Sequence, residues 1–241
     1  MSHFFLRSKH YLLFFPLIIP TLLSFYFQVE YMAWITEMQQ EMIAAGPDGI
    51  NDAFDIPNLA NYKGYFVGFL FITGLAAATK LGWWYNIGTE LEKYLPTGTN
   101  LKSSRLKLAI GVMATLVLVQ LIALYVGFDW AAGVASEMSA TIQAGGEPTF
   151  PDPGEFMGPF LMIFGLFFLG GIISFAANVY SAYYVGKTLR CIEKDKALQG
   201  SDIAGYAVLS YFLMIGIWIL QPKVNRLMET GRMDEPGKED W

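Results

Sequence analysis

Five long apolar stretches, separated by short polar segments, limit the folds that this chain can adopt. The stretches cover about residues 11–35, 61–88, 105–131, 157–188 and 203–220. A helix needs about 20 apolar residues to cross a bilayer, and each stretch is close to that length or exceeds it. Only 15% of the 241 residues are charged, which is below the share usual for soluble domains. We therefore predict an all-α integral membrane protein with four to five transmembrane helices.

The distribution of Lys and Arg predicts how these helices are oriented. The segments 89–107 and 186–202 each carry four basic residues, whereas about 36–60 and 132–156 carry none and hold acidic residues instead. Because positively charged loops stay on the cytoplasmic side, we expect a cytoplasmic N-terminus and two acidic loops that face outward. Short loops and a sharp charge asymmetry are typical of a multi-pass protein of the bacterial inner (cytoplasmic) membrane, which is the location we predict.

The fifth stretch, 203–220, permits two interpretations. We favour a full crossing that begins after a capping signal at Ser201 and Asp202. Such a crossing would place the basic residues that follow it on the outer side, against the charge rule. The alternative is a segment that enters the membrane, bends and returns, because Gly216 interrupts the stretch and Pro222 follows it.

Two short motifs occur twice at nearly the same separation. Residues 37–46 and 137–146 agree at four of ten positions, and 85–91 (YNIGTEL) and 183–189 (YYVGKTL) share Tyr, Gly and Leu, at offsets of 100 and 98 residues. We predict two tandem two-helix hairpins related by a pseudo-twofold axis along the membrane normal. The predicted single transmembrane domain comprises repeat A at about 10–93, repeat B at about 105–194, and a C-terminal apolar helix with a polar tail at about 201–241.

Small residues at spacings that let helix backbones approach closely occur on the second helix of each hairpin. These candidate packing residues are Gly64, Gly68, Ala78, Gly82, Gly170, Ser174, Ala177 and Ser181. We expect the two helices to form the centre of the bundle. Aromatic residues near the predicted span ends are interpreted as interfacial anchors. They are Trp34, Trp83, Trp84, Tyr85, Trp130, Tyr183 and Tyr184.

Polar side chains inside the spans are candidate functional residues, because each is costly in lipid. Lys80 lies in the second span, and Asn178 corresponds to it at the offset of 98 residues. Together they could form a central site for a substrate, an ion or a lipid head group. Alternatively, the Lys80 ammonium reaches past its neighbouring tryptophans to the cytoplasmic surface while Asn178 bonds a neighbouring helix. We expect Gln120, the third candidate, to bond across helices.

The chain offers little for catalysis or for holding a cofactor. Both His residues precede residue 11 and there is one Cys, so a metal or redox centre held by this chain alone is not expected. No P-loop, GxSxG elbow or nucleotide fingerprint occurs, and the acidic segment 47–55 lacks the EF-hand spacing. We predict no catalytic, cofactor-binding or metal-binding residue. The acidic charge balance, with a net charge of -5, predicts no nucleic acid partner.

Membrane lipids are the first predicted partners. The segment 216–227 (GIWILQPKVNRL) ends the last apolar stretch with two cations, and we expect Lys223 and Arg226 to contact lipid head groups. The single Cys191 lies in a basic segment and is expected to carry a free thiol, which could be lipidated.

The favoured function is a non-catalytic multi-pass subunit or scaffold of a larger membrane protein complex, formed with other membrane subunits or with further copies of this chain. Apolar positions in the two acidic loops would serve for docking. The alternative is a small oligomeric transporter or channel that uses Lys80 and Asn178. A lipid-modifying enzyme is the third hypothesis, for which the sequence provides no nucleophile beside a base.

Overall fold

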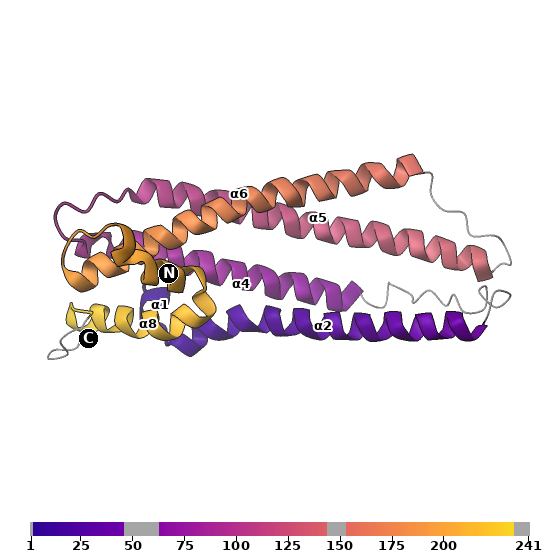
Figure 1. Cartoon of the computed structure of the whole chain (residues 1–241), viewed down its shortest axis with the longest axis horizontal. Helices are drawn as coiled ribbons and strands as arrows, with labels where there is room; N and C mark the ends of the chain where they lie inside the picture. The colour runs from indigo at the N-terminus through magenta and orange to yellow at the C-terminus, as the bar shows by residue number, and fades with distance from the viewer. Residues whose placement is uncertain (1, 46–62, 144–152, 234–241) are drawn as a thin grey trace. The chain divides into compact units, whose positions relative to one another are not determined.

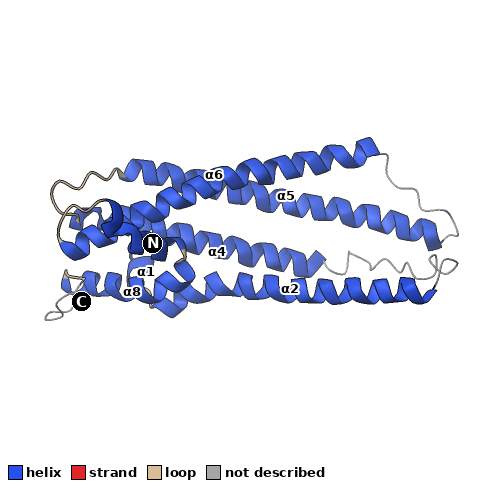
Figure 2. Ribbon diagram, in the orientation of Figure 1, coloured by secondary structure: helices blue, strands red, loops and turns tan. Residues whose placement is uncertain are grey.

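Helices make up nearly all of the described chain, and no strand occurs among the described residues (Figure 2). The structure is a computed structural model of the whole chain, and it describes residues 2–45, 63–143 and 153–233. The elements in chain order are α1 (Ser2–Arg7), α2 (His10–Ala45), α4 (Lys63–Glu90), the 3₁₀ turn η2 (Leu91–Tyr94), α5 (Ser103–Gln143), α6 (Pro153–Lys194), the 3₁₀ turn η3 (Gly200–Ile203), α7 (Ala204–Tyr211) and α8 (Leu213–Thr230) (Figure 1).

Three of the described helices are long and apolar enough to cross a membrane, over Lys63–Tyr94, Ser103–Met138 and Phe160–Lys194. The bent pair α7–α8 raises this number to four if it counts as one span. In α2 the described apolar segment is shorter and covers His10–Tyr26. The predicted all-helical class is therefore confirmed, together with apolar helices of membrane-spanning length.

The long helices extend beyond the apolar stretches into the segments predicted as acidic loops. Helix α2 continues to Ala45, α5 continues to Gln143, and α6 already begins at Pro153. The added turns of α2 and α5 contain Ala, Glu, Met and Gln, which are good helix formers, and proline is favourable at the first position of a helix. The predicted loops at 36–60 and 132–156 are therefore partly helical.

The fifth apolar stretch is two helices rather than one, which corrects the predicted single C-terminal helix. The chain breaks at Phe212, and α7 and α8 are bent by 114° to each other. A Cβ on Gly216 would lie 1.9 Å from the Leu209 carbonyl oxygen, so only glycine permits α8 to pass this close to α7. The capping signal at Ser201 and Asp202 is also corrected, because η3 and α7 begin without a side-chain cap.

The chain contains two compact units. Unit 1 consists of Met1–Ile19, Gly74–Leu118 and Leu169–Trp241, and unit 2 consists of Pro20–Thr73 and Val119–Phe168. Unit 1 thus combines α1, α7 and α8 with one end of each long helix. Of the Lys and Arg residues that the structure describes, all except Lys63 belong to unit 1.

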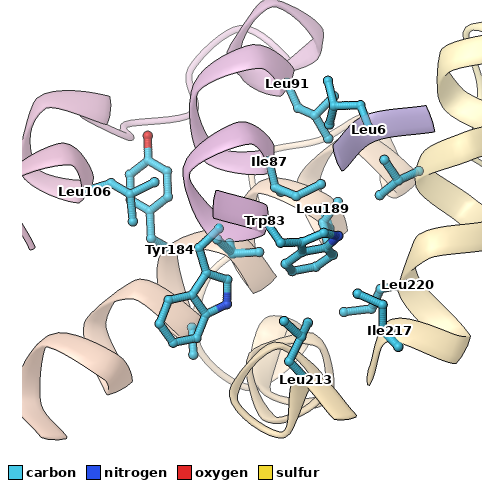
Figure 3. Close-up of a cluster of buried hydrophobic side chains, with 14 of the residues drawn as sticks. Leu6, Trp83, Ile87, Leu91, Leu106, Tyr184, Leu189, Leu213, Ile217 and Leu220 are labelled. Atoms are coloured by element: carbon cyan, nitrogen blue, oxygen red, sulfur yellow. The ribbon is translucent and has the colours of Figure 1, made fainter. Parts of the chain in front are cut away.

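The core of unit 1 is a cluster of large buried side chains from α1, α2, α4, α5, α6 and α8 (Figure 3). Its members include Leu6, Trp83, Ile87, Leu91, Leu106, Tyr184, Leu189, Leu213, Ile217 and Leu220. Trp83 and Trp84 are 0% exposed and Tyr184 is 2% exposed. These three residues therefore pack inside the protein, and their interpretation as membrane anchors was wrong. Tyr85 and Tyr183 are exposed, as anchors require.

Unit 2 is held by contacts between α4 and α5. The Lys63 ammonium lies 2.5 Å from the Asp129 carboxylate, and the rings of Phe66 and Phe128 stack with centroids 4.3 Å apart. On α6, three phenylalanines at four-residue spacing, Phe160, Phe164 and Phe168, stack on one another and are all exposed. An apolar, aromatic face of α6 is therefore open in this unit.

Candidate functional site

The candidate site of unit 1 is a set of polar side chains that join the C-terminal helices to the rest of the unit. Gln221 of α8 is 0% exposed and lies at its centre. The indole Nε1 of Trp83 donates a hydrogen bond to Gln221 Oε1 at 2.6 Å, and Gln221 Nε2 donates to the Phe5 carbonyl at 2.9 Å and the Ser8 carbonyl at 3.1 Å. Asn225, one turn later, donates from Nδ2 to the same Ser8 carbonyl at 3.2 Å.

The geometry of α1 explains why these carbonyls are available. Helix α1 ends at Arg7 and α2 begins at His10, so carbonyls around the break lack the partner that a continuous helix would supply. The Gln221 amide reaches both Phe5 and Ser8, and a fully buried indole N–H is satisfied by the other end of the same side chain. The sequence alone assigns no mechanism to the segment 216–227. In the structure, its Gln221 and Asn225 side chains hold α8 against α4 and the N-terminal region of unit 1.

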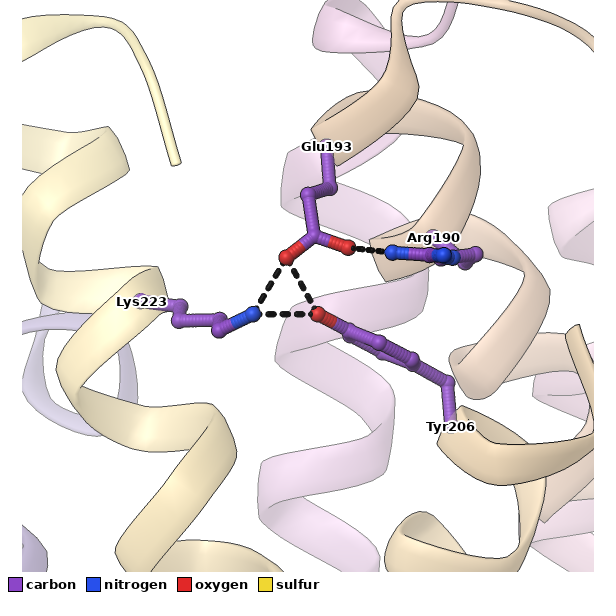
Figure 4. A network of polar contacts seen from close by, with 4 residues as sticks. All are labelled: Arg190, Glu193, Tyr206 and Lys223. Atoms are coloured by element: carbon purple, nitrogen blue, oxygen red, sulfur yellow. Dashed lines mark hydrogen bonds and ion pairs between the residues drawn. The ribbon is translucent and has the colours of Figure 1, made fainter. Parts of the chain in front are cut away.

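A second polar network surrounds Glu193 near the C-terminal end of α6 (Figure 4). Its side chain is only 4% exposed and forms ion pairs with Arg190 on the same helix and with Lys223 on α8. The Tyr206 hydroxyl of α7 donates to Glu193 Oε1 at 2.5 Å, and the Lys223 ammonium donates to the Tyr206 hydroxyl oxygen at 2.7 Å. One carboxylate therefore joins residues on both sides of the bend at Phe212.

Lys80 of α4 lies beside the bend between α7 and α8. Its ammonium is 4.6 Å from the centre of a Trp84 ring and 5.4 Å from the centre of the Tyr211 ring, which is the last residue of α7. The Trp84 indole N–H donates to the Ser210 carbonyl at 3.2 Å and so ties α4 to the same turn of α7. The half-buried Lys80 side chain is stabilised by cation–π contacts, and no carboxylate within the described residues forms an ion pair with it.

The structure does not join the other two intramembrane candidates to Lys80. Asn178 donates from Nδ2 to the Ser174 carbonyl of its own helix at 2.8 Å. Gln120 is half-buried on α5 in unit 2, and its side chain makes no hydrogen bond within the part of the chain that the structure describes. The expected bonds from Asn178 to a neighbouring helix and from Gln120 across helices are therefore absent from the described contacts.

The candidate packing residues lie in different environments. Gly82 lies against the Phe5 ring, Ala177 packs on the core, and Ser181 is fully buried. By contrast, Gly64 and Gly68 face open space, because nothing lies within 4 Å of a Cβ built on either. Of the remaining three candidates, Ala78 is exposed, Gly170 is buried and Ser174 is half-buried.

Two further close approaches involve glycines that the sequence indicated only as repeat matches. A Cβ on Gly186 would lie 2.4 Å from the Ala207 backbone nitrogen of α7, and one on Gly88 would lie 2.0 Å from the Leu106 side chain of α5. Each glycine therefore packs against a helix that follows it in the chain. The signal in the sequence was the shared Tyr, Gly and Leu, but not the partner helix.

The predicted lipid contacts of α8 and the predicted lipidation of Cys191 differ from what the structure shows. Lys223 is engaged by Glu193 and Tyr206, which is a protein site rather than the lipid head group expected for it. Arg226 is half-buried on α8 and also has an interaction partner. Cys191 is 0% exposed and its sulfur accepts a hydrogen bond from the Leu198 backbone N–H at 3.4 Å, so this thiol is not accessible for lipidation.

Within the ranges 2–45, 63–143 and 153–233, no three His, Cys, Asp or Glu side chains are grouped as a metal site would require. The acidic segment 47–55 lies outside the described residues, as do four of the apolar positions expected to serve for docking, Ile50, Phe54, Ile56 and Phe150. Comparisons with protein-family models, with curated proteins and with solved structures gave no match to this chain.

Proposed function

We propose that this protein is a non-catalytic multi-pass scaffold or subunit of a larger membrane complex. The observation that carries this proposal is the contrast between the polar groups of unit 1, which are engaged within the chain, and the exposed apolar faces of the long helices. The Glu193 carboxylate and the Gln221 amide are both committed to contacts within the chain. Groups engaged in this way stabilise a fold and leave little for chemistry on a substrate.

The apolar helix faces, in contrast, remain open. In the most apolar part of the three long spans, only 17%, 11% and 6% of the residues are buried. Phe164 and Phe168 on α6 are 57% and 58% exposed. Lipid, a partner helix or a second copy of the chain would cover such faces. These open faces support a role in binding within the membrane.

The contacts at Glu193 also support a topology in which α7 and α8 enter the membrane and return to the same side. Tyr206 precedes the bend and Lys223 follows it, yet both bond one carboxylate at the end of α6. In this topology the basic residues of α8 share the cytoplasmic side with the other basic segments, as the charge rule requires. We propose that unit 1 faces the cytoplasm of a bacterial inner membrane, with both ends of the chain on that side.

Equivalent environments at the repeated motif support the proposed duplication. Tyr85 and Tyr183 are 42% and 41% exposed, whereas Leu91 and Leu189 are both 0% exposed. Between them, Gly88 and Gly186 are both buried against a following helix. Chance similarity between apolar segments does not predict the same burial at each matched residue. We infer two tandem hairpins followed by the bent pair.

The test is mild extraction of the tagged protein at native expression level, followed by native-gel separation and mass spectrometry. A scaffold is expected to migrate with a partner in fixed stoichiometry. A photo-crosslinking residue at Phe164, which is exposed, should capture that partner, whereas one at the buried Leu189 should not. A chain that migrates alone, with equal crosslinking from both positions, would contradict the proposal.

A small oligomeric transporter is the second candidate, because Lys80 is a cation within a span that has only aromatic partners among the described side chains. Lys80→Gln should abolish flux of the transported ion or solute through such a transporter while the protein remains inserted. The same variant should leave the stoichiometry of a scaffold complex unchanged. Flux that is unaffected by Lys80→Gln would remove the transporter from consideration.

A further inference from the structure

Five of the described lysines lie beside aromatic rings, and two of them, Lys63 and Lys223, also have a carboxylate partner. Lys63 lies 5.6 Å from the centre of the Tyr125 ring and pairs with Asp129. Lys223 lies 5.3 Å from the centre of the Tyr206 ring and pairs with Glu193. Both sites therefore combine an aromatic face with an anion.

Lys80 has the aromatic half of this arrangement without the anion. Trp84 and Tyr211 supply two rings, but no carboxylate in the described ranges pairs with the ammonium. An unpaired cation is costly within a bilayer, and Lys80 lies inside the span Lys63–Tyr94. The environment of Lys80 is therefore complete only when an anion from outside the chain joins it.

The surroundings of Lys80 indicate which anion this is. Trp84, over which the ammonium lies, is six residues from Glu90 at the end of α4, or about 9 Å along the helix axis, which is a depth close to the lipid head groups. Phe212 and Ile215, at the bend next to Tyr211, are 59% and 63% exposed. An anionic site next to an open apolar surface fits a molecule that has both a phosphate and acyl chains.

We propose that Lys80 binds the phosphate of an anionic phospholipid from the adjacent leaflet. The aromatic rings of Trp84 and Tyr211 position the ammonium, and the exposed side chains at the bend contact the acyl chains. The lipid thus occupies the turn between α7 and α8 and stabilises it. This inference requires only that α4 lies in a bilayer, and it does not depend on the scaffold proposal.

The test is native mass spectrometry of the full-length protein after delipidation and incubation with phosphatidylglycerol or phosphatidylcholine. Wild type should retain phosphatidylglycerol in preference to phosphatidylcholine. Lys80→Gln should lower the retention of phosphatidylglycerol about fivefold, which is the contribution of one basic residue to binding at an anionic membrane surface. Lys93→Gln is the matched control, because exposed Lys93 also lies over a ring, that of Tyr94 at 5.2 Å. This control and Lys80→Arg should both retain the lipid.

A second measurement uses the wild type alone and keeps the inference testable if Lys80→Gln fails to fold. Amine-reactive labelling followed by peptide mapping should show that phosphatidylglycerol protects Lys80 but not Lys93, whereas phosphatidylcholine protects neither. Equal lipid retention by Lys80→Gln and wild type, or no protection of Lys80, would overturn the proposal. Equal protection by inorganic phosphate would also overturn it, because the ligand would then be a small anion. Loss of partner co-purification would not bear on this result.

Discussion

At the scale of single residues, Gln221 is a fully buried polar side chain that joins α8 to α4 and to the N-terminal region of unit 1. Its amide accepts from the Trp83 indole and donates to two backbone carbonyls of the N-terminal region. An apolar residue of similar size would fill the same volume but would leave the indole N–H and the carbonyls without partners. A buried donor or acceptor without a partner costs about 1–3 kcal/mol.

We therefore expect Gln221→Ala to lower the free energy of unfolding by about 1–3 kcal/mol, because it removes the partner of a fully buried indole N–H. Thermal unfolding in detergent, followed by tryptophan fluorescence, measures this loss. The control is Gln199→Ala at an exposed position, where we expect a change within about 0.5 kcal/mol. Similar midpoints for Gln221→Ala and wild type would show that this network does not stabilise the protein.

The sequence alone identifies several residues of these networks but not their partners. The segment 216–227 was noted for its Gln, Asn and cations, and Lys80 was noted as an intramembrane cation. Glu193 was not selected, because an acidic residue among basic residues near a helix end is typical of an exposed surface position. Its importance comes from Tyr206 and Lys223, which approach it only after the chain bends at Phe212.

At the scale of elements, glycines decide which helices come into backbone contact. Gly186 lets α6 approach the backbone of α7, and Gly216 lets α8 approach Leu209. Because α7 contains only eight residues, these two approaches restrain much of its length. The bent pair is therefore located by close packing on both sides of the bend as well as by the polar contacts of Glu193.

Gly186→Ala should lower the free energy of unfolding by about 1–3 kcal/mol, because the added methyl meets the Ala207 backbone, which cannot move without separating α6 from α7. Gly171→Ala on the same helix is the matched control. Nothing lies within 4 Å of its Cβ, so it should be neutral or stabilising by up to about 1 kcal/mol. Denaturation midpoints in mixed micelles compare the two variants, and equal destabilisation would argue against the close approach.

The apolar stretches predicted the four long helices well, because a helix long enough to cross a membrane must be apolar over most of its length. They did not predict the break at Phe212, since both α7 and α8 are apolar and hydropathy does not register a change of direction. The helix ends were also missed, because helix propensity continues past the apolar residues of α2 and α5. The packing role of Gly88 and Gly186 depends on helices that follow them, which spacing alone does not identify.

At the scale of the whole molecule, charge separates the two units. The described basic residues other than Lys63 belong to unit 1, and Lys63 is paired with Asp129 in unit 2. This distribution was readable from the sequence and underlies the proposed orientation. The same rule conflicted with a full crossing by the fifth stretch, and the contacts of Tyr206 and Lys223 support the interpretation that removes the conflict.

Single cysteines in a Cys191→Ala background test this topology. A membrane-impermeant maleimide added to spheroplasts should label Ala131→Cys, but should label Lys93→Cys and Glu229→Cys only after permeabilisation. All three positions are exposed, so differences in labelling report the side of the membrane. Labelling of Glu229→Cys from outside would mean that α7 and α8 cross the membrane, and the proposed return to the cytoplasmic side would be wrong.

The bonds from Gln221 to Phe5 and Ser8 join positions that are 216 and 213 residues apart in the chain. Synthesis proceeds from the N-terminus, so Phe5, Ser8 and Trp83 leave the ribosome long before Gln221, and their carbonyls and the indole find this partner only after Gln221 has been made. Until then the nascent protein presents unsatisfied polar groups that an insertase or a membrane protease can recognise. A nonsense mutation between codons 195 and 221 would leave α2, α4, α5 and α6 complete but would remove Gln221, so the carbonyls and the Trp83 indole would lack their partner.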